Sequence, residues 1–353
     1  MKKLTIFLTL LGLVAITAAV AWSGFGSVMH AVMRIGLGGF LLMVCCQLAV
    51  NGVLGLAWYS AVPEIGYLRL LGARMVRDAA ATCLPFSQLG GIVIGIRATC
   101  SGHGFHKRDS RAVDLPEATA ANLVDITTEV MGQTAFVLLG VAFLVAHQRN
   151  SPFVVPVIFG AVFLMVGTAG FVWTQRNGGH IFRRLGSKFS SSLAAQWHDN
   201  LLTGAGNLQE RMEAVWSHPL RICGSAFYHF LGWLSSAAML WLAANLMGAG
   251  LSFPNAIAVE GVTCAIMSVG FLVPGSLGVQ EGAYIALGHA FGLESSVSLG
   301  LSLLRRGREL ALGIPVLLLW QFMEMRGLRA TTRPEPVQTP DAAYVPTSSV
   351  VKE

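Results

Sequence analysis

Charged residues are scarce in this sequence. They make up 12% of its 353 residues, whereas hydrophobic residues make up 54%, and the mean hydropathy is +0.62. A soluble domain of this length needs a more polar surface, so the sequence predicts an integral membrane protein. The apolar runs are continuous and do not alternate with polar residues, which favours membrane-spanning helices over the strands of a barrel.

Motifs for covalent chemistry and metal binding are also missing. The six cysteines form no CxxC pair and have no histidine at metal-ligand spacing, so we assign no disulfide and no metal site. The sequence has no Walker loop and no catalytic constellation. Its net charge is +6, but Lys and Arg lie beside the apolar runs. They are typical of topology signals and headgroup contacts, so we expect no cofactor and no nucleic-acid partner.

Several apolar segments are long enough to cross a bilayer as helices. The predicted full spans are residues 1–22, 36–62, 118–146, 152–174, 222–247 and 295–325. The first span ends in small residues, which also fits a cleavable signal peptide, and we favour an uncleaved span. We therefore predict a transmembrane domain over residues 1–329 and a disordered tail, rich in Pro, Thr and Ser, over residues 330–353.

The stretch FLVPGSLGVQEGAYIALGHAFGL, residues 271–293, is the most unusual apolar run. Pro274 and Gly275 interrupt it, because proline removes a backbone donor and glycine weakens a helix. A broken backbone survives in hydrocarbon only where protein or a wet cavity satisfies its polar groups. The sequence therefore predicts two half-helices that meet inside the membrane.

An earlier segment, LPFSQLGG, carries a fainter copy of this pattern. It predicts helix breaks at Pro85, Gly90 and Gly91. If residues 79–98 crossed the membrane, two consecutive loops on opposite faces would both be strongly positive, whereas a re-entrant pair avoids that conflict. The two copies suggest an inverted repeat. Coincidence is the alternative, because Pro, Gly and Ser are common in membrane helices.

The predicted fold is an all-α polytopic membrane protein with about six full spans and two re-entrant segments, one entering from each side. Both termini are expected in the cytoplasm. A rival count makes each broken segment a true crossing and gives about eight spans. Residues 66–78 are predicted to form a basic amphipathic helix lying at an interface, and residues 175–219 a cytoplasmic interfacial loop.

Charged side chains inside apolar helices are costly and usually face a cavity or a partner. Asp125 and Glu129 lie four residues apart on one helix face, and Arg305 and Glu309 share that spacing in the last span. We predict that such residues line a cavity for a lipid headgroup. The predicted set is Asn122, Asp125, Glu129, Ser276, Gly278, Gln280, Glu281, Arg305, Arg308 and Glu309.

In this interpretation the arginines hold phosphate oxygens, and Ser276 with the amides after Pro274 presents a helix N-terminus to an anion. Glu281 would repel an anion there unless an arginine neutralises it. The alternative is that Asp125 and Glu129 pair with the arginines at 305–308 and hold two helices together, or that the charges lie shallow and reach the interface.

The broken stretch and the later RRGREL resemble the flippase-like membrane family related to the membrane region of lysylphosphatidylglycerol synthase. LPFSQLGG with VDITTEVMGQ is similar to the first-half counterpart. The resemblance covers residues 4–327 and, within the family, is to the hopanoid-biosynthesis-associated membrane proteins called HpnL. It implies a multi-pass protein of the Gram-negative inner membrane that moves or presents a lipid, a hopanoid, a hopanoid-linked lipid or a phospholipid.

The sequence departs from the wider family in two places. An Arg commonly precedes the acid after the first motif, but Val124 precedes Asp125 here, so no arginine role is carried over. Some relatives bear a soluble aminoacyl-transfer domain after the membrane region, and we do not expect that activity from this chain.

Three functions are open to such a protein. The favoured one is a lipid translocase or lipid-binding transporter that is not an enzyme. The second is a membrane-embedded transferase that joins a polyterpenoid to a sugar or lipid, with Asp125 or Glu129 as general base and Arg305 or Arg308 holding a phosphate leaving group. The third is a scaffold for hopanoid-pathway enzymes. The sequence does not predict the oligomeric state.

Overall fold

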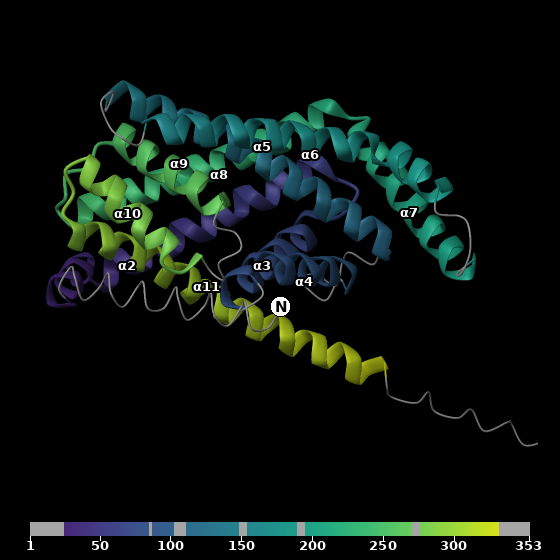
Figure 1. The fold of residues 1–353 in the computed structure, drawn as a ribbon. Coiled ribbons are helices and arrows are strands. Elements are labelled where there is room, and N and C mark those ends of the chain that lie inside the picture. The colour runs from purple at the N-terminus through teal and green to yellow at the C-terminus, as the bar shows by residue number, and fades with distance from the viewer. Residues whose placement is uncertain are drawn as a thin grey trace, which may run out of the picture.

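The computed structural model describes residues 25–84, 87–101, 111–147, 154–188, 195–269 and 276–331 (Figure 1). All regular elements within these ranges are helices. They are α2 (Phe25–Ala61), α3 (Tyr67–Cys83), α4 (Ser87–Ser101), α5 (Leu115–His147), α6 (Val154–Lys188), α7 (Ala195–Trp216), α8 (Pro219–Leu246), α9 (Phe253–Val269), α10 (Val279–Ala290) and α11 (Ser295–Thr331). This confirms the predicted all-α fold.

Four of the described helices are long and apolar enough to cross a membrane. They contain Met33–Ala61 of α2, Leu115–His147 of α5, Val157–Arg176 of α6 and Pro219–Leu246 of α8. Helix α11 has 37 residues and a length of about 55 Å, so it exceeds the bilayer core although its charges keep it out of this set. The predicted first span, residues 1–22, lies outside the described residues.

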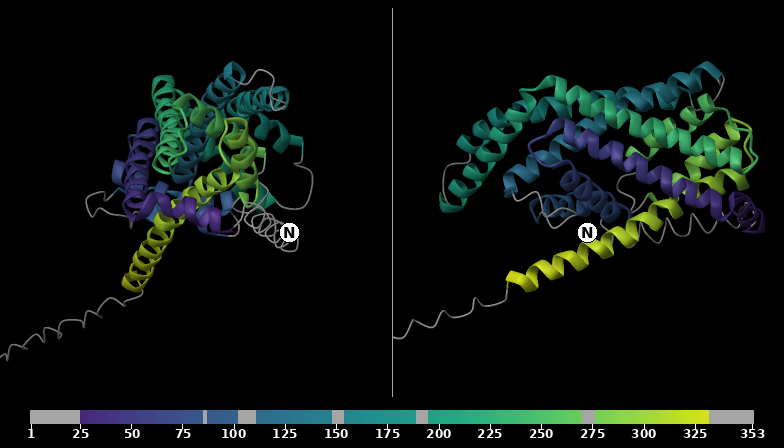
Figure 2. Two further views of the ribbon diagram at one scale, coloured as in Figure 1. Left: turned by 90° about the vertical axis from the view of Figure 1, so that its left-hand side faces the viewer. Right: turned by 180° about the vertical axis from the view of Figure 1, so that it is seen from behind.

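Two hairpins of short helices stand apart from these long helices. The arms of the first, α3 and α4, have 17 and 15 residues, and those of the second, α9 and α10, have 17 and 12. At 1.5 Å per residue each arm is at most about 26 Å long, less than the roughly 30 Å of a bilayer core. The two hairpins lie towards opposite ends of the bundle (Figures 1 and 2). Their lengths favour re-entrant segments over crossings.

The positions of the helix breaks differ from the prediction in the first hairpin. Gly90 and Gly91 lie inside α4, so their prediction as breaks is wrong. Gly91 serves close packing instead, because a Cβ there would lie 2.8 Å from the carbonyl oxygen of Arg77 on α3. Helix α3 ends at Cys83 and α4 begins at Ser87. Pro85, Pro274 and Gly275 lie outside the described residues.

Helix α3 does not lie on the surface as a basic amphipathic helix, so this prediction is wrong. Its arginines Arg69, Arg74 and Arg77 are buried, and the helix packs against α2, α4 and α11. Arg69 donates hydrogen bonds to the carbonyl oxygens of Thr99 and Cys100 at 2.7 and 2.8 Å. Carbonyls in the last turn of a helix lack intrahelical partners, so Arg69 caps α4 and closes the base of the hairpin.

The described helices form two halves with the same packing plan. The first half comprises α2–α5 and the second α8–α11. Helix α5 packs against α8 and α9, and α11 packs in the same way against α2 and α3, while α2 and α8 pack against each other. Each long helix thus holds the hairpin of the other half. This cross-packing is the pattern expected of two structural repeats.

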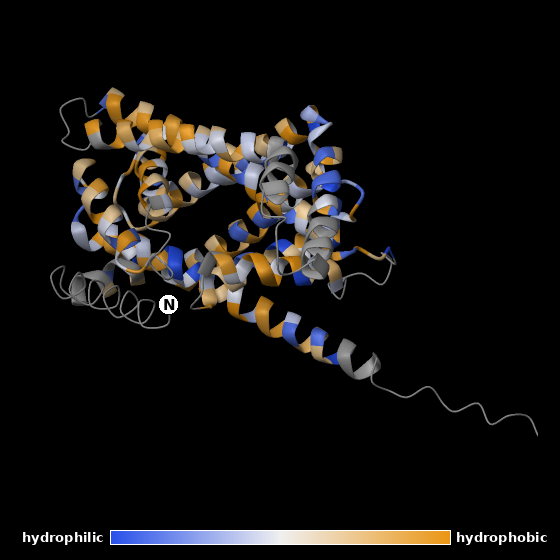
Figure 3. Ribbon diagram, turned by 45° about the vertical axis from the view of Figure 1, so that its right-hand side comes forward, coloured by the Kyte–Doolittle hydropathy of each residue, from blue (hydrophilic) through white to orange (hydrophobic). Residues whose placement is uncertain are grey.

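Residues 175–219, predicted as an interfacial loop, are largely helical. Helix α6 continues to Lys188 and α7 spans Ala195–Trp216, where it packs against α5 and α6. Hydrophobic residues cover most of the outer helices, and hydrophilic residues lie towards the centre of the bundle (Figure 3). Helix α11 runs to Thr331, and the remainder of the predicted tail lies outside the described residues.

Glycines let the long helices approach closely. A Cβ on Gly132 of α5 would lie 2.7 Å from the backbone oxygen of Ala226 and 2.7 Å from the backbone nitrogen of Phe230 on α8. A Cβ on Gly140 would lie 2.9 Å from the Cα of Gly261 on α9. Small residues at such crossings are how membrane helices gain contact area without a hydrophobic driving force.

We expect Gly132→Ala to destabilise the bundle. Alanine favours a helix by about 1 kcal/mol over glycine, but here its methyl group must push two backbones apart, and overpacking costs about 1–3 kcal/mol. The measurement is thermal unfolding of the purified protein in detergent. Gly167→Ala is the control, since nothing lies within 4 Å of a Cβ there. Equal melting temperatures for the two variants would contradict the close approach.

Candidate functional site

A cavity of about 540 Å³ lies between the two halves. Its wall includes residues from each of the helices α2–α5 and α8–α11, and residues beside both hairpin tips contribute, among them Thr82, Ser268 and Ser276. Its volume falls within the range of about 300–1,000 Å³ that holds small molecules. Its wall carries many polar and charged side chains, although the surrounding helices are apolar.

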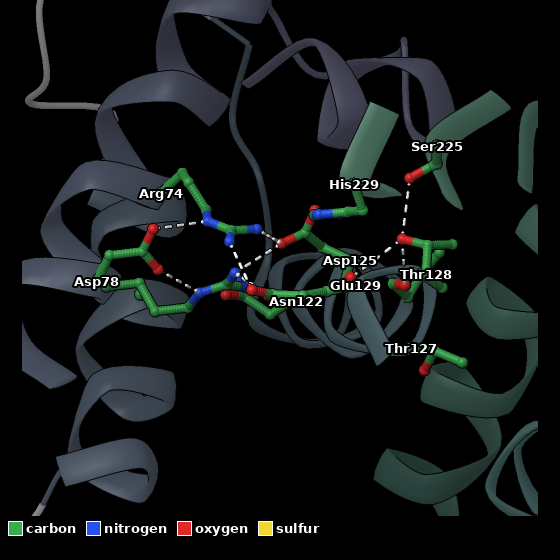
Figure 4. A network of polar contacts seen from close by, with 12 residues as sticks. Arg74, Asp78, Asn122, Asp125, Thr127, Thr128, Glu129, Ser225 and His229 are labelled. Carbon is green, nitrogen blue, oxygen red and sulfur yellow. Dashed lines mark hydrogen bonds and ion pairs between the residues drawn. The ribbon is translucent and has the colours of Figure 1, made fainter. Parts of the chain in front are cut away.

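The first-half cluster, Arg74, Arg77, Asp78, Asp125, Glu129 and His229, joins α3 to α5 and α8 (Figure 4). The guanidinium of Arg74 donates to Asp78, Asp125 and Glu129 at 2.8, 2.9 and 2.8 Å. Nη2 of Arg77 lies 2.8 Å from Oδ2 of Asp125. Asp125 is fully buried, so its charge depends on these two arginines.

His229 completes the coordination of Asp125 from α8. Its Nε2 lies 3.1 Å from Oδ1 of Asp125, and its Nδ1 is buried and has no hydrogen-bond partner among the described residues. A carboxylate only accepts hydrogen bonds, so Nε2 of His229 is the donor in this contact and links α8 to the cluster.

The second-half cluster, Glu260, Glu281, Tyr284, Arg305, Arg306, Arg308 and Glu309, joins α9 and α10 to α11. Arg305 pairs with Glu260 and with Glu309. The hydroxyl of Tyr284 donates to Oε2 of Glu260 at 2.7 Å and accepts from Nη1 of Arg305 at 3.2 Å. Glu260 is thus satisfied at both oxygens, as a buried carboxylate must be.

The N-terminus of α10 is occupied by a side chain of its own helix. Oε2 of Glu281 accepts from the amide of Gly278 at 2.8 Å, and its Oε1 accepts from Arg306 at 2.8 Å. This carboxylate already interacts with the positive end of the helix. The prediction that this end receives an external anion is therefore not supported, although an arginine does neutralise Glu281. Ser276 has a φ of 50° and lines the cavity.

Arg308 differs from the other arginines of the cavity wall. It is buried, and its Nη1 lies 3.2 Å from the sulfur of Met239. Its Nε is buried without a hydrogen-bond partner, and no carboxylate lies within ion-pair distance of it among the described residues. Arg308 therefore keeps hydrogen-bonding capacity that Arg74 and Arg305 have already used.

The predicted site residues divide into two groups. Those on the cavity wall are Glu129, Ser276, Gln280, Arg305, Arg308 and Glu309. Those outside the wall are Asn122, Asp125, Gly278 and Glu281. The amide nitrogen of Asn122 donates to the carbonyl of Ala118 at 2.8 Å and lies 3.3 Å from the hydroxyl of Thr99. Asp125 supports the wall from behind, through the two arginines of α3.

Sequence reasoning missed the partners of these charges. Asp125 and Glu129 pair with Arg74 and Arg77, not with the arginines at 305–308. The signal was present, because residues three apart on α3 form one basic face, but it was interpreted as a contact with lipid headgroups. His229 and Tyr284 gave no signal, since a single polar residue in an apolar run is compatible with many environments.

We expect Arg74→Gln to destabilise the protein strongly, because it leaves Asp125 buried with fewer donors. Removing one partner of a buried pair costs about 3–5 kcal/mol. Arg221→Gln is the control, since its pair with Glu64 is exposed on both sides and such pairs are worth about 0–1 kcal/mol. The measurement is the free energy of unfolding of each variant in detergent. If Arg74→Gln and Arg221→Gln lowered this free energy by similar amounts, the first-half cluster would not hold α3 in place.

Comparison with known proteins gives one match. No curated protein and no solved structure matches the chain. The model of one protein family, described as the lysylphosphatidylglycerol synthase TM region, matches residues 9–316, which include both hairpins and both clusters. This match covers most of the chain and agrees with the all-helical, apolar fold. The chain therefore belongs to the family of the lysylphosphatidylglycerol synthase transmembrane region and is a lipid-related membrane protein.

Proposed function

We propose that this protein binds a membrane lipid by its headgroup in the central cavity and moves it between leaflets. The observation that carries the proposal is the cavity itself, a chamber of about 540 Å³ inside an apolar helical protein, whose wall carries charged and amide side chains beside apolar ones. A lipid headgroup can leave water only for a site that offers it polar partners, because an unsatisfied polar group in hydrocarbon costs several kcal/mol. The cavity wall offers such partners.

The two hairpins support movement as well as binding. Residues beside both tips line the cavity, including Thr82 and Ser276, and each hairpin packs on the long helix of the other half. Proteins built from two repeats commonly bind their substrate between them and expose it alternately by rocking one repeat against the other. We propose the same for this chain, with the two hairpins entering from opposite faces.

The finer assignment rests on resemblance. VPGSLGVQEGAYIALGHAFGL and RRGREL are similar to HpnL proteins, and we propose that the lipid belongs to hopanoid or hopanoid-linked metabolism. The corresponding location is the inner membrane, with both termini in the cytoplasm. The sequence has no recognisable catalytic motif, which favours transport. The transferase alternative would use Glu129 of the cavity wall as general base and Arg305 or Arg308 to hold a phosphate leaving group.

The test is a reconstitution experiment. Full-length protein in liposomes that contain a fluorescent lipid should increase the fraction of label that crosses between leaflets, with no change in the mass of the lipid. A covalent product would support a transferase instead, and label that stays in its original leaflet would overturn the proposal.

We expect Ser236→Trp to abolish this movement, because Ser236 lines the cavity and an indole would fill much of it. Gly170→Trp is the matched control. A Cβ on Gly170 meets nothing within 4 Å, so an added indole lies outside the bundle. Equal melting temperatures show that both variants fold, and the rate of label movement is then compared. A Ser236→Trp protein as active as the control would mean that the lipid does not pass through the cavity.

A further inference from the structure

Side-chain amides are concentrated on the wall of the cavity. Gln47 and Asn51 of α2, Gln133 of α5 and Gln280 of α10 all line it. A carboxamide carries an acceptor oxygen and a two-hydrogen donor nitrogen, so it matches a hydroxyl group, which also donates and accepts. Ionic ligands do not need such groups, since guanidinium or carboxylate partners bind them more strongly.

Part of this hydrogen-bonding capacity is not used by the protein. Nε2 of Gln47 donates to Oδ1 of Asn51 at 3.0 Å, which leaves the Gln47 oxygen and the Asn51 nitrogen without a partner among the described residues. Nε2 of Gln133 donates to the hydroxyl of Ser268 at 3.1 Å, which leaves the Gln133 oxygen open in the same sense. The wall thus presents two free acceptors and one free donor among the described residues.

The arginines of the wall are largely neutralised. Among the described residues, the wall itself carries five arginines and three carboxylates, Asp78, Glu129 and Glu309. Four of these arginines also pair with Asp125, Glu260 or Glu281, which lie behind the wall, so the two clusters together contain five arginines against six carboxylates. Carboxylates are also the more accessible groups, since the Asp78, Glu129 and Glu309 side chains are 42%, 26% and 30% exposed, whereas those of Arg74 and Arg77 are 3% and 5% exposed. Exposed carboxylate oxygens accept hydrogen bonds from hydroxyls and repel phosphate.

An aromatic face completes the wall. Trp233 lines the cavity and is stacked on Phe136, with ring centroids 6.4 Å apart and planes at 17°. The stacking fixes the indole in one orientation. A rigid aromatic surface beside hydrogen-bonding groups suits a ligand that has C–H faces as well as hydroxyl edges, as a sugar ring does.

We propose that the lipid bound in this cavity carries an uncharged, polyhydroxylated headgroup, a sugar or another polyol. This inference rests on the proposed function and names the substrate class of the same site. The hydroxyls bind the open atoms of Gln47, Asn51 and Gln133 and the exposed oxygens of Glu129 and Glu309, and Trp233 packs against the carbon skeleton. Among the described residues, unused guanidinium donors remain on Arg308 and at Nη1 of Arg77, and both serve as donors to hydroxyl oxygens.

The experiment compares headgroups on identical acyl chains. Full-length protein is placed in nanodiscs of phosphatidylcholine, free of sugar-based detergent, and titrated with glucosyl-diacylglycerol, phosphatidylglycerol or phosphatidylethanolamine, with binding followed by native mass spectrometry. We expect the glucosyl lipid to bind at least about tenfold more tightly than either phospholipid, as expected from one or more additional hydrogen bonds. Tighter binding of phosphatidylglycerol or phosphatidylethanolamine would overturn the inference.

Two variants and one control test the residues. Asn51→Leu and Gln133→Leu should each weaken binding of the glucosyl lipid by about tenfold and change phospholipid binding little. Gln209→Leu, on the exposed face of α7 and outside the cavity wall, should leave both unchanged. If either cavity variant fails to fold, the other decides. The headgroup assignment would be contradicted if the cavity variants weakened binding of all three lipids equally. It would also be contradicted if they left binding of the glucosyl lipid unchanged.

The two proposals fail separately. Protein that moves a phospholipid between leaflets but does not prefer the glucosyl lipid would keep the transport function and overturn the headgroup inference. Protein that prefers the glucosyl lipid but moves no labelled lipid would keep the headgroup inference and overturn transport.

Discussion

The buried ion pairs between the short hairpins and the long helices are the interactions on which this structure depends. Arg74 and Arg77 bind Asp125 and Glu129 across α3 and α5, and Arg305 binds Glu260 across α11 and α9. A half-helix too short to span the bilayer cannot be positioned by hydrophobic thickness alone. Directional contacts with a neighbouring helix supply the position.

These pairs serve mainly as a frame for the cavity, and of their carboxylates only Glu129 also lines it. Each carboxylate in the deepest positions is saturated, since Asp125 has three cationic or N–H partners and Glu260 has Arg305 and Tyr284. Removal of any one partner would leave a buried charge uncompensated in a low-dielectric interior, which is strongly destabilising. The frame is therefore stiff, and the neutral amides in front of it remain free to meet a ligand.

The two halves use the same packing plan with opposite charge placement. In the first half the hairpin carries the arginines and the long helix the acids, whereas in the second half α9 carries Glu260 and α11 carries the arginines. Both arrangements hold a hairpin against a long helix, because an ion pair attracts equally whichever of the two helices carries the arginine. Both halves therefore contribute arginines and carboxylates to the wall of the cavity.

The sequence by itself determined the helical membrane class, the interruption of two apolar segments and the presence of costly charges on the third and last predicted spans. These features depend on residues that are close together in the sequence, because hydropathy decides whether a segment can span the membrane and proline and glycine affect the helix within a few residues of their own position. It did not determine that Gly90 and Gly91 continue α4, because a glycine can either break a helix or admit a neighbouring backbone, as Gly91 does at Arg77. Only the tertiary structure decided that Asp125 meets Arg74 and His229, residues 51 and 104 positions away, because any of several arginines could neutralise a buried acid and the packing of the helices selects which one reaches it.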